Sequence, residues 1–102
     1  MITKYKDAKI LLEKELGPVT FAMFLRCMRD SQDLTQAEMA KELDLTVSSI
    51  CDIEKGRHLV SPALAAKIAK KFGFSVHLAV ECALQDQITK AKLNYRVKLS
   101  SA

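Results

Sequence analysis

Several residue types are scarce in this sequence, and each scarcity excludes a class of protein. The chain of 102 residues has no tryptophan, three glycines, two prolines and only 6% aromatic residues. So few glycines and prolines exclude a collagen-like or low-complexity disordered chain, and they disfavour a β-sandwich with its many turns. Hydrophobic residues make up 49% of the chain. That share, in a chain of this length, favours one all-helical domain with a modest core.

Long hydrophobic runs and targeting segments are also missing. The sequence contains no apolar run of about 18 residues, the length that a membrane-spanning helix needs. It has no charged segment followed by an apolar stretch and a cleavage site, the pattern of a secretory leader. We therefore expect a cytoplasmic protein that does not associate with membranes.

The residue patterns of catalytic and metal-binding sites are not found either. The two histidines, His58 and His77, lie far apart in the sequence, and we expect no metal site. The three cysteines, Cys27, Cys51 and Cys82, are widely spaced, so we expect reduced thiols that act as small hydrophobic side chains. No nucleophile with an adjacent base, pair of catalytic carboxylates or phosphate-binding glycine loop is recognisable. We expect neither enzymatic activity nor a cofactor.

Positive charge is concentrated in the second half of the chain. The net charge is +4 at pH 7. From Ile53 onward there are nine basic and three acidic side chains, whereas residues 1–52 carry seven basic and nine acidic ones. A basic half fits a nucleic-acid surface, but it also fits an ordinary solvated helix surface. Charge alone leaves both interpretations open.

The most informative stretch is residues 34–57, whose pattern predicts two short helices joined by a tight turn. Thr35 can cap the first helix with its hydroxyl, and Glu38 completes a capping box. Thr46 offers a cap for the second helix, which Gly56 can end. Apolar residues recur at helical spacing within both segments, at Met39, Ala40, Leu43, Ile50 and Ile53. Two short helices across so tight a turn form a helix-turn-helix.

Further helices are predicted on both sides of this motif. Apolar spacing, capping residues and breakers place them at residues 2–16, from Thr20 to about Ser31, from Ser61-Pro62 to Gly73, and from Ser75 to roughly Lys90. Gly17-Pro18 separates the first helix from the rest. That first helix is either an additional core helix or an arm that docks a partner. Arg26 and Arg29 are expected to be surface charges.

The C-terminal residues change their period. Leu93, Tyr95, Val97 and Leu99 alternate with polar residues, which predicts a short β-strand. A single strand in a helical domain has no partner of its own. Either it pairs with its twin in a second subunit across a two-fold axis, or the tail is loosely docked or disordered.

Residues 34–57 resemble the helix-turn-helix of lambda-repressor-like, Cro-type regulators, the xenobiotic-response-element family of bacterial transcription factors. The positions that carry the resemblance are Gln36, Met39, Ala40, Leu43, Leu45, Ile50, Ile53 and Glu54-Lys55-Gly56-Arg57. The sequence departs from the family at Asp44, where glycine is usual, although aspartate tolerates a left-handed backbone better than most residues. Residues 60–99 also resemble a proteobacterial subgroup of these regulators.

The resemblance implies an all-α fold, a lambda-repressor-like five-helix DNA-binding domain at residues 20–91. The chain adds to this domain the extra N-terminal helix predicted from its own residue spacing, with a linker, at residues 1–19. A short C-terminal β-strand or tail at residues 92–102 completes the chain, with dimer pairing as its possible role.

The resemblance also implies which residues contact double-stranded DNA. In such folds the second helix of the motif lies in the major groove. By matching position, the residues at base edges are Val47, Ser48 and Asp52, and those at phosphates are Thr35, Gln36, Ser49, Lys55 and Arg57. For Asp52 two alternatives are open: its carboxylate reads a cytosine amino group, or it turns away to pair with a neighbouring cation.

The expected function is that of a dimeric repressor, a transcriptional regulator that reads a pseudo-palindromic operator through the helix from Thr46 to Lys55. The alternative with the same fold is an antitoxin that neutralises a partner toxin and regulates its own operon. A third hypothesis, from another class, is a helical protein-interaction module that never touches DNA. The sequence offers no ligand-binding domain, so no small-molecule effector is expected.

Overall fold

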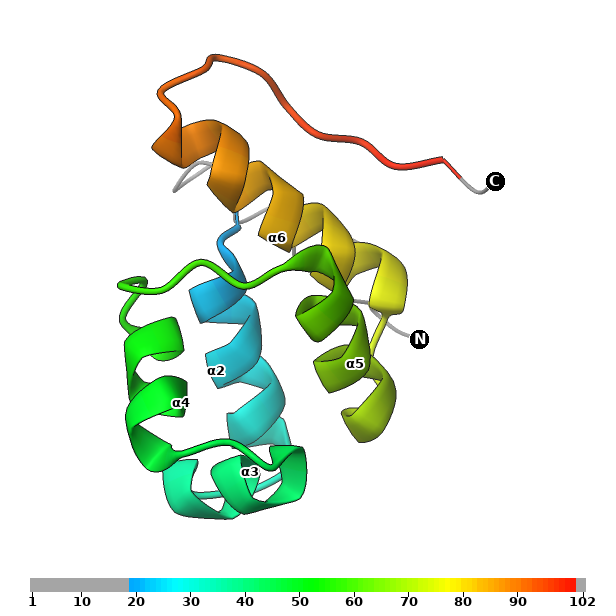
Figure 1. Cartoon of the computed structure of the whole chain (residues 1–102). Helices are drawn as coiled ribbons and strands as arrows, with labels where there is room; N and C mark the ends of the chain where they lie inside the picture. The colour runs from blue at the N-terminus through cyan, green and yellow to red at the C-terminus, as the bar shows by residue number, and fades with distance from the viewer. Residues whose placement is uncertain (1–18, 101–102) are drawn as a thin grey trace.

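A computed structural model describes residues 19–100, which form five helices followed by an extended C-terminal segment (Figure 1). The helices are α2 (Phe21–Ser31), α3 (Gln36–Leu43), α4 (Val47–Glu54), α5 (Pro62–Phe72) and α6 (Val76–Lys90). The predicted helix at residues 2–16 lies outside the described residues. The predicted helices from Thr20 onward are confirmed, with ends that differ by a residue or two.

Each described helix begins with a capping hydroxyl, and the sequence predicts those at Thr35, Thr46, Ser61 and Ser75. The side chains of Thr20, Thr35, Thr46, Ser61 and Ser75 each accept a hydrogen bond from the backbone N–H three residues later. Each cap satisfies one of the N–H groups that a helix start leaves without an intrahelical acceptor, and contributes about 1 kcal/mol. At α3 the Glu38 side chain also accepts from the Thr35 N–H, which completes the predicted capping box.

The turn between α3 and α4 depends on Asp44. This residue adopts the left-handed conformation, with φ 58° and ψ 42°. The next N–H, from Leu45, donates to the carbonyl oxygen of Ala40 at 2.8 Å, which satisfies a carbonyl at the helix end. Ala40 is buried beside the turn. Its small side chain lets the two helices of the motif cross closely.

The hydrophobic core lies around α2, which packs against α4 on one side and α6 on the other. α3 packs on α4, and α5 packs on α6. The largest fully buried side chains come from all five helices: Phe21, Leu25, Met28, Met39, Ile50, Ile68 and Cys82. Edge-to-face contacts join the ring of Phe24 to those of Phe21 and Phe74, with centroids 6.1 and 6.3 Å apart. This core fixes the helix-turn-helix to the rest of the domain.

The cysteines differ in burial. Cys82 belongs to the core and Cys51 is partly buried, whereas Cys27 is exposed on the outer face of α2. The expectation of a small hydrophobic side chain therefore suits Cys82 and is wrong for Cys27.

The C-terminal segment corrects the strand prediction. Residues 93–100 are extended but contain no β-strand, because no second backbone lies beside them within residues 19–100. Instead, the Gln85 and Glu81 side chains of α6 bond to backbone groups of Tyr95, Val97 and Leu99. Figure 1 shows this segment turning back after α6 and running along the helix. The alternation in the sequence therefore produces an extended tail held by side chains.

Candidate nucleic-acid interface

The first turn of α4 is exposed, although the rest of the helix is anchored in the core. Val47 is 47% exposed and Ser48 is exposed. On the opposite face Ile50 and Ile53 are buried. Because residues three apart in a helix share a face, these two isoleucines fix which side α4 turns outward. An apolar methyl group and a hydroxyl are therefore presented to solvent at one helix end.

The start of α4 also offers hydrogen-bond donors. The Thr46 hydroxyl oxygen accepts from the Ser49 N–H at 3.0 Å and donates to the Ser49 hydroxyl oxygen at 3.0 Å. In this arrangement the Ser49 hydroxyl accepts from Thr46, so its own proton remains to be donated outward. The first-turn N–H groups of Val47 and Ser48 have no intrahelical acceptor. Together with the helix dipole, such groups favour an anion such as a phosphate.

At the start of α3, the side chains of Thr35 and Gln36 already form hydrogen bonds within the protein. Gln36 is partly buried, and its Nε2 donates to Glu54 Oε1 at 3.0 Å. The Thr35 hydroxyl and N–H are both engaged in the capping box. What remains for an anion is the second amide hydrogen of Gln36 and the first-turn backbone N–H groups of Gln36 and Ala37.

The charged side chains beneath Gln36 were missed by sequence reasoning. Arg29 of α2 forms a two-pronged ion pair with Glu54, Nε to Oε2 at 2.6 Å and Nη2 to Oε1 at 3.1 Å. A third Arg29 nitrogen donates to the Leu34 carbonyl at 3.0 Å. Arg29 is thus no surface charge, and the expectation for it was wrong. Glu54 ties α2, α3 and α4 together.

The environment of Glu54 keeps its carboxylate charged. Only 5% of this residue is exposed. Burial alone would raise the pKa of Glu54, but the hydrogen bonds from Arg29 and Gln36 outweigh it and hold the pKa below its usual value. The hydrogen bonds that Arg29 donates to Glu54 in turn raise the pKa of Arg29. Both partners are therefore ionised at neutral pH, and the network fixes where α3 and α4 begin.

The sequence did contain a signal for this network. Glu54 lies one and four residues after Ile53 and Ile50, which places a carboxylate on the inward face of α4. A buried charge requires a partner. Arg29, 25 residues earlier in the chain, supplies it.

The residues after α4 carry exposed cations. Lys55 caps the helix, and Gly56 has φ 72°, which turns the chain away. Arg57 Nη1 lies 3.5 Å from Asp52 Oδ1, in an exposed ion pair. In the structure Asp52 thus pairs with a cation. Such an exposed pair contributes little free energy and can open when a phosphate competes for Arg57.

Comparison with known proteins agrees with this geometry. A family model described as helix-turn-helix matches residues 25–78, which spans α3, α4 and α5. The chain belongs to this lambda-repressor-like helix-turn-helix family of DNA-binding regulators. Over 52 residues it is 42% identical to an uncharacterised helix-turn-helix-type transcriptional regulator of Methanocaldococcus jannaschii, an alignment that covers 51% of this chain and 79% of that protein. No solved structure gives a significant match.

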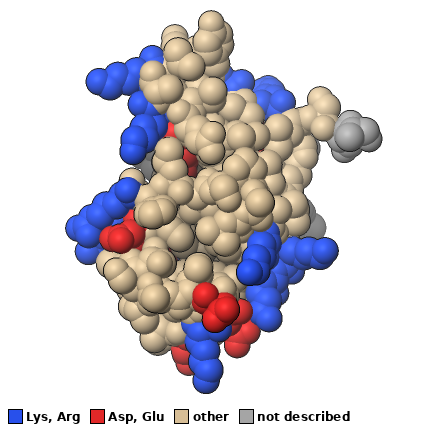
Figure 2. Space-filling model, viewed as in Figure 1, with Lys and Arg blue, Asp and Glu red and all other residues tan. Residues whose placement is uncertain are grey.

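Charged residues surround the helix-turn-helix. Figure 2 shows basic side chains beside α4 and over the lower end of α5, each with acidic side chains nearby. On α5 the basic residues are Lys67, Lys70 and Lys71, and Lys71 lies 3.8 Å from Glu42 of α3. The helix-turn-helix surface is therefore mixed in charge.

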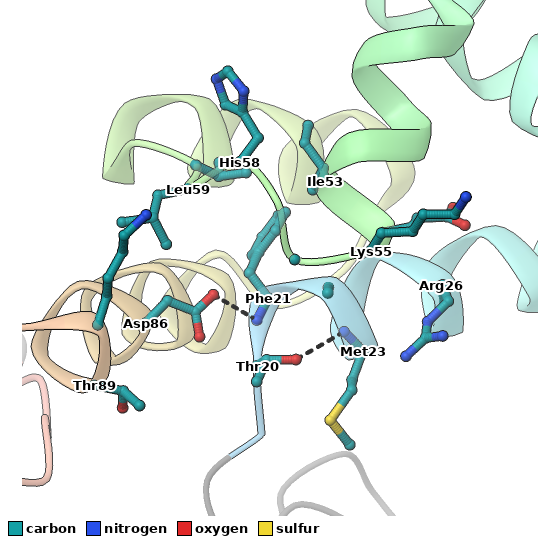
Figure 3. Close-up of a pocket in the computed structure, with 15 residues that line it drawn as sticks. Thr20, Phe21, Met23, Arg26, Ile53, Lys55, His58, Leu59, Asp86 and Thr89 are labelled. Atoms are coloured by element: carbon teal, nitrogen blue, oxygen red, sulfur yellow. Dashed lines mark hydrogen bonds between the residues drawn. The ribbon is translucent and has the colours of Figure 1, made fainter. Parts of the chain in front are cut away.

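A groove of about 690 Å³ lies next to the end of α4, between the start of α2 and the end of α6 (Figure 3). In it Asp86 Oδ2 accepts from the Phe21 N–H at 3.0 Å. Burial raises the pKa of Asp86, and this hydrogen bond offsets the effect in part. Lys55 and His58 lie at the rim, on the side of the helix-turn-helix. Asp86 thus ties the end of α6 to the start of α2.

The described residues 19–100 contain neither a metal-binding cluster nor a membrane-spanning helix. No group of three histidine, cysteine or acidic side chains in this part of the chain could hold a metal ion. None of its helices is long and apolar enough to cross a lipid bilayer.

Proposed function

We propose that this chain is a sequence-specific transcriptional repressor that binds a pseudo-palindromic operator as a dimer, with α4 in the major groove. The observation that carries the proposal is the exposed first turn of α4 above the buried Ile50 and Ile53. A helix held in this way presents its opening residues to base edges. Half-sites recognised by two copies would lie about 34 Å apart, one turn of the duplex.

The proposed base contacts follow from the chemistry of the first two turns. Val47 packs on a thymine methyl group, and the Ser48 hydroxyl bonds to a base edge. Asp52 reaches a cytosine amino group only after DNA draws Arg57 away to a phosphate, because the two side chains pair in the free protein. Its contribution therefore depends on that exchange.

The proposed phosphate contacts flank these residues. Backbone N–H groups at the start of α3, beside Thr35 and Gln36, bind one phosphate, with help from the second amide hydrogen of Gln36. The Ser49 hydroxyl binds another, and Lys55 and Arg57 bind the backbone beyond the helix. These contacts position the protein, and they carry no sequence information of their own.

Fluorescence anisotropy with a duplex enriched from a random pool tests the proposal. We expect salt-dependent binding that a scrambled duplex does not reproduce. Ser48→Ala should change the preferred base at one position of each half-site, whereas Gln36→Ala should weaken binding to all sequences alike. Equal affinity for enriched and scrambled duplexes would contradict sequence-specific binding. If both variants weaken binding to all sequences equally, Ser48 does not contact a base edge.

One feature suits the antitoxin alternative. Leu93 and Tyr95 are 50% and 71% exposed, and an antitoxin needs exposed apolar residues that cover its toxin. This role predicts that an adjacent reading frame arrests growth unless this chain is co-expressed, and that Tyr95→Ala abolishes the rescue. Normal growth without co-expression would exclude a toxin of that kind.

A further inference from the structure

The groove beside the end of α4 is bordered by cations from three helices. Arg26 lies on α2, Lys55 caps α4, and Lys90 is in the last turn of α6. We call these three exposed residues the rim cations. His58, in the loop after α4, lies at the rim as well. The groove thus connects the helix-turn-helix to the end of α6.

The rim cations are not neutralised by neighbouring acids. Arg29, Arg57 and Lys71 each form an ion pair with a carboxylate. Within residues 19–100, by contrast, none of the rim cations forms an ion pair or a side-chain hydrogen bond. A single unpaired cation on a protein surface is ordinary. Three of them around one groove create a positive potential that attracts an anion.

The two carboxylates that line the groove are already engaged. Glu54 is buried and accepts hydrogen bonds from Arg29 and Gln36. Asp86 accepts the Phe21 N–H at 3.0 Å, and burial raises the pKa of Asp86. The charge of Glu54 is therefore balanced by Arg29, and Asp86 faces the start of α2. Neither of them takes up the rim cations.

The rim cations are spread around the groove and do not meet at one point. Figure 3 shows Arg26 and Lys55 on one side of the groove and Thr89 on the other. Lys90 follows Thr89 at the end of α6. A single small anion binds best where several cations converge. A DNA strand, which carries a charge about every 3.4 Å of helix axis, matches cations that are spread along its path.

The groove is also continuous with the proposed DNA-binding surface. Its lining includes the last residues of α4 and the residues just after it: Ile53, Glu54, Lys55 and Gly56. Figure 2 shows basic side chains along the left edge of the molecule, from the end of α6 down to α4. A DNA strand that passes Lys55 therefore reaches the groove next.

We propose that the DNA backbone continues from the α4 contact across this groove, where Lys90 of α6 and Arg26 of α2 each bind a phosphate. This inference rests on the proposed function and adds to it two phosphate contacts from outside the helix-turn-helix. The imidazole N–H of His58 donates to the same strand. These contacts lengthen the footprint on DNA and carry no sequence information.

The salt dependence of DNA binding tests the contact of Lys90. Lys90→Ala should reduce the slope of log affinity against log salt by about 0.9, the value for one phosphate. Lys90→Arg should keep the slope of the wild type. Lys70→Ala is the matched control, because it removes a lysine from the last turn of α5 and so loses the same interaction with a helix end. A slope for Lys90→Ala equal to that of the wild type would overturn the proposal.

Ethylation interference locates the phosphates. In this experiment single phosphates of the enriched duplex carry a neutral ethyl group, and each phosphate that the protein binds is detected as a loss of affinity. We expect at least one phosphate that matters for the wild type and not for Lys90→Ala. It should lie beyond the phosphates that Lys55→Ala makes unimportant. Arg26→Ala should release a different phosphate. Interference patterns of Lys90→Ala and Arg26→Ala identical to that of the wild type would contradict the proposal.

These outcomes separate the groove from the reading of bases by α4. If the groove binds DNA but α4 does not read it, enriched and scrambled duplexes bind equally, and Lys90→Ala still lowers the slope. That result supports the groove contact and rejects the proposed function. If α4 reads DNA but the backbone does not cross the groove, the sequence preference persists and Lys90→Ala leaves the slope unchanged. That result overturns the groove contact alone.

Discussion

At the scale of single residues, Glu54 is the group on which the helix-turn-helix depends most. We expect Glu54→Ala to lower the free energy of unfolding by about 3 kcal/mol, because it leaves the Arg29 guanidinium and the Gln36 amide without their partner. Urea unfolding measures this loss. Replacing both Arg29 and Glu54 by methionine should recover most of it, since no buried charge remains. A loss below about 1 kcal/mol for Glu54→Ala would show that the pair is open to solvent.

The two shifted carboxyl groups predict opposite dependences of stability on pH. The folded-state pKa of Glu54 is lowered, so its contribution is complete above its unfolded pKa and is lost as pH falls through the folded value. The folded-state pKa of Asp86 is raised, so its contribution is complete below its unfolded pKa and is lost as pH rises through the folded value.

A substitution at Asp86 isolates its part of this behaviour. Asp86→Asn keeps an oxygen for the Phe21 N–H and removes the half-buried charge. We expect the variant to melt at a higher temperature than the wild type at pH 7, with the difference shrinking toward pH 3. Thermal melts at a series of pH values measure this. A variant that melts lower at pH 7 would mean that the charge itself stabilises the start of α2.

At the scale of elements, the turn between α3 and α4 depends on the left-handed backbone conformation of Asp44. Asp44 has a left-handed conformation, which glycine adopts without strain and a β-branched residue resists. We expect Asp44→Gly to change the free energy of unfolding by less than about 1 kcal/mol, and Asp44→Val to lower it by about 1–2 kcal/mol. Chemical denaturation of both variants checks the difference. Equal stabilities would show that the turn does not depend on this conformation.

The helices themselves could be predicted because their signals are local. Hydroxyl caps at Thr35, Thr46, Ser61 and Ser75 act within three residues of the sequence, and all of them are confirmed. The exposed first turn of α4 followed from the spacing of its two isoleucines. No local pattern revealed what Gln85 does, because its partners lie 10 and 12 residues away in the chain.

The same limit explains the errors at Arg29 and in the tail. Arg29 was taken for a surface charge because its partner lies 25 residues further along. The tail has the alternation of a strand, but a strand also needs a neighbouring backbone, and α6 offers side chains instead. Contacts between residues far apart in the sequence determine both the burial of Arg29 and the conformation of the tail. The periodicity of apolar residues does not reveal such contacts.

At the scale of the whole molecule, the mixed charge makes affinity depend on a few cations. The affinity for the operator should fall linearly in a plot of log affinity against log salt. Lys55→Ala should reduce the slope of that plot by about one, as expected for one lost phosphate contact. It should also lower the affinity for all DNA sequences by the same factor. Lys67→Ala, on α5, is the control and should leave the slope unchanged. Identical slopes for wild type and Lys55→Ala would remove Lys55 from the interface.

An NMR titration of the full chain with its enriched duplex tests directly whether α4 reads the DNA. We expect the largest amide shifts at the starts of α4 and α3, from Thr46 to Ser49 and at Gln36 and Ala37. We also expect a contact between the Val47 methyl groups and a thymine methyl group. Shifts confined to other elements, with Val47 and Ser48 unchanged at saturation, would contradict the claim that α4 reads the DNA.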